Sequence, residues 1–406
     1  MTPILIIVLL LVLAAEFVIG WTDSPNAIAT VVSTRVLSPK KAVAMAAILN
    51  IVGVLVTGTA VAATIGKGII KPEVIGLPVI AAAMIALVIW STIAFRYGLP
   101  TSESHALIAG LTGAGLVSAG PQVLLWSGWQ KVIIGLGFST FLGFGLALFI
   151  TIALYHALRK VRASTIRQIF GRLQILSAAF MAFSHGSNDG QKFIGVFTMA
   201  LVLGGVLPKF DVPIWVILLC GLVMGIGTLT GGWRIIKTMG FKLTKLEPFS
   251  GFAAESSAGL TITAASFFGI PLSTTHTINT AIMGVGGYKI MTNELTLGYF
   301  LSFTLYLGFL IAPIVQMSNI STQLTTAFVA KLVDTAGNPI PNESITFAFP
   351  SGGYPTGATG QAITVTSGTT NASGQVSTLL TLGNKIGSYI VRATYSGGPT
   401  ISTDFT

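Results

Sequence analysis

Long apolar segments recur along the first three quarters of this 406-residue sequence. Blocks such as residues 42–65, 78–95, 131–157 and 212–232 approach the roughly 20 residues needed to cross about 30 Å of hydrocarbon. Only 8% of all residues are charged, against about 25% in soluble domains. The pattern predicts a multi-pass, all-α protein of the cytoplasmic membrane. The apolar stretch from Pro3 lacks a preceding basic region, so we expect a membrane span there and not a cleaved signal peptide.

Positive charge is concentrated in two short segments of the apolar part. Residues 159–172 carry five Lys or Arg and no acid, and residues 234–245 form a second basic segment. The positive-inside rule places both segments in the cytoplasm, where anionic lipid headgroups can also bind them. This placement favours contact with the lipid bilayer over nucleic-acid binding as the reason for the net charge of +10. The single cysteine, Cys220, excludes an intramolecular disulfide framework.

Two halves of the apolar part repeat the same order of motifs. Asp23 and Asp189 lie 166 residues apart, and "GLPTSESH" (98–105) matches "GIPLSTTH" (269–276) at an offset of 171. Each motif pair is separated by long apolar segments and is followed by a short Gly-rich run, about the length of a re-entrant half-helix. We predict duplicated, inverted repeats with discontinuous helices. The expected divisions are a first repeat at 1–158, a basic cytoplasmic loop at 159–172, and a second repeat at 173–317.

The composition changes after Val315 toward Thr, Ser, Gly, Asn and Pro. Short β-branched runs separated by turn sequences predict an antiparallel β-sandwich over residues 318–406. The runs are "TTAFVAKLVD", "ESITFAF", "AITVTSG", "GQVSTLLTL" and "SYIVRATYSG". The segments "DTAGNPIPNESITF" and "TTNASGQVSTLLT" resemble bacterial Ig-like modules of the invasin type. That resemblance implies an extracytoplasmic location for the tail.

Two buried acids with neighbouring amides mark the first predicted polar centre. A carboxylate in the middle of a span costs about 2.5–3.5 kcal/mol, so such acids normally face a polar cavity or a partner. Pro25 cannot donate a backbone hydrogen bond, and "HGSNDG" contains two glycines, so we expect both helices to be broken beside their acids. The freed carbonyls would add to the oxygens of Asp23, Asn26, Asn188 and Asp189 in a sodium site. The alternative is that Asp23 only caps a half-helix.

The Pro-Ser-His motifs predict two helix N-termini that carry hydroxyl groups. Free N–H groups and a partial positive charge at a buried helix N-terminus can hold an oxyanion. The residues concerned are Thr101, Ser102, Ser104, His105, Ser273, Thr274, Thr275 and His276. Ordinary N-capping is the alternative for each motif taken alone. The histidines could bind the ligand, carry a proton, or only pack; no G-x-S-x-G pattern accompanies them, so we expect no enzyme activity.

Several intramembrane polar residues break the twofold pattern. Asn50 and Glu255 are candidates for an extra cation site or a gate, and Lys192 could pair with Asp189 or guide an anion. Glu16 and Gln174 are further candidates for such a cation site or gate. Because Glu16 lies close to a predicted helix end, the alternative for it is that the side chain reaches the membrane interface.

Three segments of the chain are similar to signature segments of the PiT family of inorganic phosphate transporters. They are "GWTDSPNAIATVVSTRVLSP", "GRLQILSAAFMAFSHGSNDGQK" and "GFAAESSAGLTITAASFFGIPLSTTHTINTAIMGVG". The resemblance covers residues 1–317 and implies secondary transport of phosphate driven by Na⁺ or H⁺. Asp23, Asn26, Asn188 and Asp189 match the repeated G-A-N-D-V-A-N-A motif of the family. Trp21, Thr22 and Lys192 depart from that motif, and Glu103 and Ser104 replace two threonines of P-x-S-T-T-H.

Taken together, these features predict a Na⁺-coupled symporter of inorganic phosphate. Asp23, Asn26, Asn188, Asp189 and Gln174 would bind the co-transported sodium ions, with no organic cofactor, and the two hydroxyl-rich helix ends would bind phosphate. Proton-coupled transport of phosphate or metal phosphate and transport of sulfate are the nearest alternatives. A passive anion channel and a membrane-anchored adhesion protein are alternatives of another class. A homo-oligomer remains open.

Overall fold

The structure is a computed structural model that describes residues 2–72, 75–242, 246–292, 325–357, 359, 361–381, 389–397 and 401–405. The chain divides into two compact units, one formed by residues 1–118 and 122–312 and the other by residues 119–121 and 313–406. The predicted boundary at 317/318 and the last predicted apolar block, residues 295–315, lie outside the described residues.

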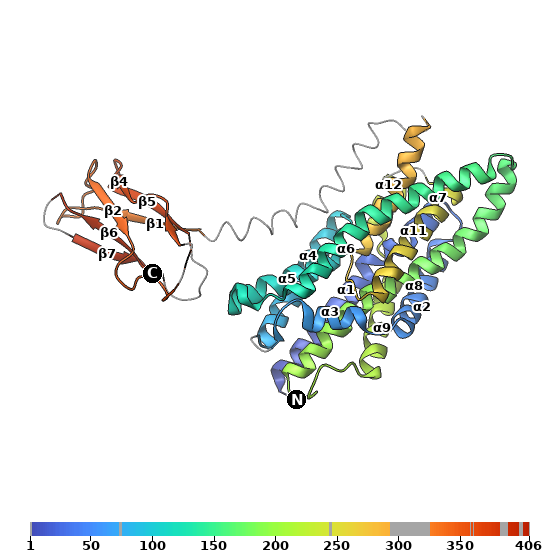
Figure 1. Ribbon diagram of the computed structural model, residues 1–406, viewed down its shortest axis with the longest axis horizontal. Coiled ribbons are helices and arrows are strands. Elements are labelled where there is room, and N and C mark those ends of the chain that lie inside the picture. The colour runs from blue at the N-terminus through green and yellow to red at the C-terminus, as the bar shows by residue number, and fades with distance from the viewer. Residues whose placement is uncertain are drawn as a thin grey trace. The chain divides into compact units, whose positions relative to one another are not determined.

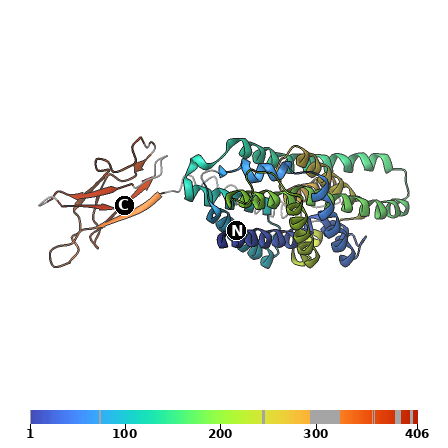
Figure 2. The same ribbon diagram turned by 90° about the horizontal axis from the view of Figure 1, so that it is seen from below.

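The first unit is helical throughout its described part, and its helices lie side by side (Figures 1 and 2). Its first half contains α1 (Pro3–Ser33), α2 (Pro39–Val56), α3 (Ala60–Gly68), α4 (Leu77–Tyr97), α5 (Glu103–Ala119), η2 (Pro121–Val123), α6 (Trp126–Gly137), η3 (Phe138–Leu142) and α7 (Gly143–Leu158). Its second half contains α8 (Ala163–Leu203), α9 (Ile214–Thr230), α10 (Trp233–Lys237), η4 (Thr238–Lys242), α11 (Pro248–Phe267) and α12 (Thr274–Met291).

Proline and glycine set several of the helix boundaries. Pro3, Pro39 and Pro248 are the first residues of α1, α2 and α11, where a proline loses no intrahelical hydrogen bond. Gly98 and Gly269 follow α4 and α11 with φ of 68° and 64°, a conformation that glycine adopts without steric cost. The Pro-Ser-His motifs therefore lie in matching turns, between α4 and α5 and between α11 and α12.

Apolar helices of membrane-spanning length account for much of the described chain. Four segments qualify by length and composition: Pro3–Ser33, Pro39–Val56, Leu77–Tyr97 and Trp126–Leu158. The pair Ile214–Thr230 and Trp233–Gly240, bent by 58° at its break, would be a fifth. Because these helices expose many large apolar side chains, the first unit has the surface of an integral membrane protein.

The predicted breaks beside the two aspartates are wrong. Helix α1 continues through Pro25, and α8 runs for 41 residues through its motif glycines. Pro25 leaves the carbonyl of Trp21 without its helical N–H, but the Ser24 hydroxyl donates to that carbonyl at 3.2 Å. The glycines permit close helix contact instead of a break, since a Cβ on Gly186 would lie 2.2 Å from the backbone oxygen of Asn50.

The predicted basic loop is also shorter than expected. Helix α8 begins at Ala163, so residues 163–172 form its first turns and only residues 159–162 connect it to α7. Lys, Arg and Gln have high helix propensity. The basic residues of this segment can therefore belong to the helix instead of a loop.

The order and packing of the helices agree with a duplication. Helices α4 and α11 begin at residues 77 and 248, and α5 and α12 begin at 103 and 274, so both pairs are offset by 171 residues. Helix α1 packs extensively against α9, and α8 against α2, so the first helix of each half contacts the second helix of the other half. This exchange brings the two aspartate-bearing helices to the centre of the unit. The inverted orientation of the halves remains a prediction.

The second unit is an antiparallel β structure. Its strands are β1 (Thr325–Lys331), β2 (Ser344–Ala348), β3 (Ala362–Ile363), β4 (Ser367–Thr369), β5 (Gln375–Thr381), β6 (Val391–Tyr395) and β7 (Ile401–Phe405). They form two sheets, ordered β1-β5-β3 and β4-β2-β6-β7 (Figure 1). Ile345 and Phe347 of one sheet share a buried core with Val376 and Leu380 of the other. The strand runs predicted from the sequence all contain strands, β7 was not predicted, and the Ig-like assignment remains a prediction.

Candidate functional site

The two Pro-Ser-His turns cap the helices that follow them. The Ser102 hydroxyl accepts the His105 backbone N–H at 3.3 Å, and the Ser273 hydroxyl accepts the His276 backbone N–H at 3.1 Å. These are N-caps in which the side chain accepts an N–H three residues later. N-capping, which was the alternative to anion binding for each motif, is therefore present in both, and the same Ser–His spacing caps both helices.

The N-termini of α5 and α12 meet. The Ser104 hydroxyl donates to the Leu272 carbonyl at 3.0 Å, and the rings of His105 and His276 lie edge to face with centroids 5.0 Å apart. The partial positive charges of the α5 and α12 N-termini therefore lie close together. Among the described residues, His105 Nδ1 and His276 Nε2 are buried nitrogens without a hydrogen-bond partner. A buried, unpartnered nitrogen is costly, so these two atoms fit a ligand placed between the helix ends.

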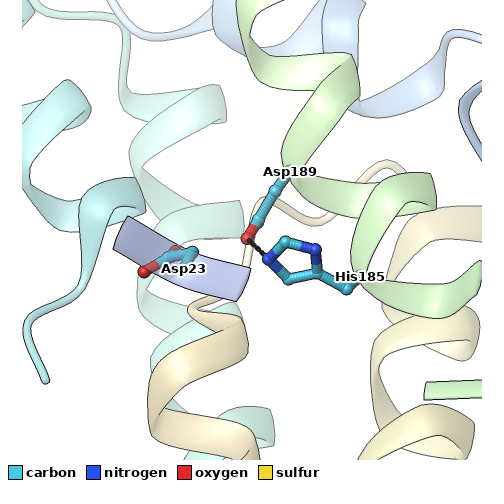
Figure 3. Close-up of side chains that lie close together, drawn as sticks. All are labelled: Asp23, His185 and Asp189. Carbon is cyan, nitrogen blue, oxygen red and sulfur yellow. Dashed lines mark ion pairs between the residues drawn. The ribbon is translucent and has the colours of Figure 1, made fainter. Parts of the chain in front are cut away.

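Asp23 and Asp189 lie beside this junction together with His185, which was not predicted from the sequence. One potential ligand atom from each of Asp23, His185 and Asp189 lies within 4.8 Å of the others, and all three side chains are buried. Figure 3 shows the Asp189 carboxylate directed at the His185 ring, with Asp23 beside the pair; the distance from His185 Nε2 to Asp189 Oδ2 is 3.1 Å. Two carboxylates and an imidazole nitrogen are a donor set that can hold a cation.

Polar contacts join the aspartates to the helix ends. The Thr274 hydroxyl donates to Asp189 Oδ2 at 2.6 Å, and Asn26 Nδ2 donates to the hydroxyls of Thr275 at 2.8 Å and Thr274 at 3.3 Å. The Lys192 ammonium donates to Asp189 Oδ1. Groups predicted to bind a cation and groups predicted to bind an anion are therefore in direct contact.

Asn188 contacts the end of α11 and the segment that leads to α12. Its amide nitrogen donates to the Ser266 hydroxyl at 3.0 Å and to the Ile270 carbonyl at 3.2 Å. Its amide oxygen is buried and has no hydrogen-bond partner among the described residues. That oxygen is available to a ligand.

A third acid, Glu103, belongs to the same centre. Its carboxylate accepts hydrogen bonds from the hydroxyls of Ser91 and, at 3.2 Å, Thr22. Glu103 also lies close enough to Asp23 to repel its charge. Thr22 and Glu103 each depart from a different family motif, and they are hydrogen-bond partners in the structure.

Gln174 and Glu255 form a separate polar network. Gln174 Nε2 donates to Glu255 Oε1 at 3.1 Å, and the Glu255 carboxylate also accepts from the hydroxyls of Thr30 and Ser177. The Thr34 hydroxyl donates to Gln174 Oε1 at 2.8 Å. The polar contacts of Gln174 therefore lie with Glu255, whereas those of Asn26 lie at the helix-end junction.

Asn50 and Glu16 are both fully buried. Asn50 Nδ2 donates to the Thr228 hydroxyl at 3.0 Å, and Asn50 Oδ1 lies 3.1 Å from His185 Nδ1, so Asn50 orients the histidine. Glu16 is 1% exposed, so its side chain is packed inside the protein and does not reach the surface of the helical unit. Within the described part of the chain, neither carboxylate oxygen of Glu16 has a hydrogen-bond partner.

The fold and this site define a class of protein. Two helix N-termini that meet inside a helical membrane unit can hold an anion there, as in the substrate sites of membrane transporters. Comparisons with known proteins agree with this class. The family model described as "Phosphate transporter family" matches residues 19–331, so the chain belongs to the phosphate transporter family.

Individual relatives cover about 70% of this chain. A protein of Rhizobium meliloti (strain 1021) named "Probable low-affinity inorganic phosphate transporter" is 42% identical over 288 residues, 71% of this chain and 86% of the relative. A Bacillus subtilis (strain 168) protein of the same name is 39% identical over 284 residues, 69% and 85% of the two chains. A solved structure described as "The sodium-dependent phosphate transporter" is similar in fold, with a TM-score of 0.66, 24% identity and coverage of 77% of this chain and 96% of that chain.

Proposed function

We propose that this chain is a secondary active transporter that couples the uptake of inorganic phosphate to Na⁺ across the cytoplasmic membrane. The observation that carries the proposal is the junction of the α5 and α12 N-termini, with unpartnered nitrogens on His105 and His276, in contact with the aspartate cluster. Phosphate would lie between the helix ends, and the cation beside Asp23. The family and the names of the relatives support phosphate as the substrate.

Charge neutralisation explains why the two sites are adjacent. Phosphate loses its hydration in a dry site, which costs several kcal/mol unless hydrogen bonds and opposite charges replace the water. The N–H groups of two helix ends and the hydroxyls around them replace part of that hydration, and a cation beside Asp23 cancels charge. Phosphate therefore binds well only with its cation, and each tenfold Na⁺ gradient then supplies about 1.4 kcal/mol per ion.

Uptake of radiolabelled phosphate into proteoliposomes tests the coupling ion. We expect an inward Na⁺ gradient at equal pH to drive accumulation above equilibrium, and Asp23→Asn to abolish the Na⁺ stimulation. Uptake indifferent to Na⁺ would reject sodium coupling. A passive channel would equilibrate phosphate without accumulating it, and excess sulfate would compete if the site did not distinguish tetrahedral oxyanions.

Proton coupling is the second candidate, and Glu16 is the observation that favours it. A buried carboxylate without a partner is stable only when it is protonated or holds a cation. An inward pH gradient in choline buffer should then drive uptake, and Glu16→Gln should remove that response while leaving any Na⁺ response intact.

A further inference from the structure

The side chain of Lys192 is a fully buried ammonium within the described part of the helical unit. It is 1% exposed and is among the largest fully buried side chains of the described chain. It lies on α8, three residues after Asp189, whose Oδ1 accepts a hydrogen bond from the ammonium. A buried ammonium is stable only when nearby groups replace its hydration.

Three oxygens from three segments surround the Lys192 ammonium. They are Asp189 Oδ1 on α8, the Ser104 hydroxyl at the start of α5, and the Leu272 carbonyl before α12, the last at 2.8 Å. An ammonium has three N–H donors, so these partners engage all of them. No donor is left for an anion, which argues against Lys192 as a direct ligand of phosphate.

The oxygens around Lys192 resemble those of a small-cation site. A carboxylate, a hydroxyl and a backbone carbonyl are the hard oxygen ligands that proteins offer to Na⁺-like ions. The second oxygen of Asp189 is also engaged, by the Thr274 hydroxyl at 2.6 Å and by His185 at 3.1 Å. Asp189 therefore has both of its carboxylate oxygens occupied by protein groups.

The matching position in the first half carries no charge. Asn26 follows Asp23 by three residues, as Lys192 follows Asp189, and its amide donates to the hydroxyls of Thr274 and Thr275. Among the described residues, Asp23 forms no ion pair; Glu103 and Asp189 repel its charge, and Lys192 attracts it without direct contact. The first half thus has an acid with no cation in contact with it, whereas the second half has an acid with its cation attached.

We propose that the Lys192 ammonium is a tethered cation that permanently fills the cation position of the second half, so that a dissociable coupling ion binds only beside Asp23. This inference rests on the proposed function and specifies its stoichiometry. One dissociable ion instead of two accompanies each phosphate at the aspartate cluster. The lysine also holds the helix ends together through Ser104 and the Leu272 carbonyl, so the positive charge stays beside the phosphate site in every cycle.

The test is an Na⁺ titration of phosphate binding at fixed pH, with the full-length protein in liposomes. Lys192→Asn places in the second half the residue type found at position 26 and opens the cation position. We expect the Hill coefficient for Na⁺ to rise by about one relative to the wild type. Phosphate affinity at low Na⁺ should fall about tenfold and recover at high Na⁺, because a free ion then replaces the ammonium.

Controls separate this role from a purely structural one. Lys131→Asn removes a lysine whose ammonium donates to the Thr64 hydroxyl at 3.3 Å, and it should leave the titration unchanged. Lys192→Arg keeps the charge and should keep the wild-type Hill coefficient. Lys192→Gln is a second neutral variant with the same expectation as Lys192→Asn, in case the shorter side chain prevents folding.

Two results would overturn the inference. Neutral variants that bind phosphate with an unchanged Hill coefficient, or that lose binding equally at all Na⁺ concentrations, would show that no cation replaces the ammonium. A Hill coefficient near two for the wild type would show that a second ion already binds, and this measurement needs no variant. Failure of the proposed function can be told apart from failure of this inference. A wild type whose phosphate binding is indifferent to Na⁺ rejects sodium coupling. A neutral variant that gains Na⁺ dependence still supports the tethered cation.

Discussion

The two aspartates at the centre of the helical unit occupy matching positions but have different surroundings. Asp189 contacts Lys192, His185 and the Thr274 hydroxyl, so its charge is compensated by the protein. Asp23 has no ion-pair partner in the described part of the chain and lies close to Glu103. The two acids thus lie at matching positions of the sequence, whereas the residues around them differ, and only one acid has a cationic side chain in contact with it.

The packing around the same residues is nearly symmetric. A Cβ on Gly20 would lie 2.3 Å from the backbone oxygen of Met224 in α9. A Cβ on Gly186 would lie 2.2 Å from the backbone oxygen of Asn50 in α2. Each half therefore uses a glycine three residues before its aspartate to approach the opposite half. The close contacts of these two glycines are alike while the charges beside the aspartates differ, so packing and charge can be tested separately.

The largest effect is expected from Asp189→Asn compared with Asp23→Asn. Removing the Asp189 charge leaves the Lys192 ammonium buried and uncompensated, which should cost about 3–5 kcal/mol of stability. Asp23→Asn removes no ion pair and should cost much less. Thermal unfolding of the two purified variants in the same detergent measures the difference.

A double variant checks the cause of that loss. In Asp189→Asn/Lys192→Met no charge of the pair remains, so most of the lost stability should return. Equal unfolding temperatures for Asp189→Asn and Asp23→Asn would contradict the view that only one aspartate is compensated.

A smaller effect is expected from the close-packed glycines, and here the two halves should behave alike. Gly20→Ala and Gly186→Ala each force a backbone contact apart and should cost about 1–3 kcal/mol. Gly171→Ala, on the same helix as Gly186, meets nothing within 4 Å and should be neutral or stabilising by up to about 1 kcal/mol. Unfolding measurements in which only one of the two motif glycines matters would show that the packing is not equivalent in the two halves.

Local sequence patterns predicted the membrane unit, the repeated motifs and most of the β-strands. These features depend on hydrophobicity, spacing and turn residues, all of which can be read from neighbouring positions. The same patterns also selected residues of both motifs, such as Asn26 and Thr275, which are 249 positions apart and form a hydrogen bond.

Local side-chain contacts and long-range packing together account for what the sequence did not predict. The hydroxyl of Ser24 replaces the hydrogen bond that Pro25 removes, so a helix that local rules would break remains continuous. His185 lies one helical turn before Asp189 and contacts it within α8, a spacing that the sequence already offered. Glu103 reaches Thr22, 81 positions away, only through helix packing, and such a partner cannot be read from neighbouring positions.

The smallest effect is expected at the ion pair of the β unit, which is the exposed counterpart of the Asp189–Lys192 pair. Arg392 donates to Asp404 at 2.7 and 2.8 Å, and the two side chains are 45% and 40% exposed. The hydrogen bonds from Arg392 lower the pKa of Asp404 below its usual value, so the pair stabilises the folded state above that usual pKa and loses its effect as pH falls through the lowered one. Because water screens an exposed pair, Arg392→Ala should barely change hydrogen exchange of the β6 and β7 amides near neutral pH, and less still in high salt. A loss of protection as large as that caused by breaking the buried pair would mean that burial does not separate the two.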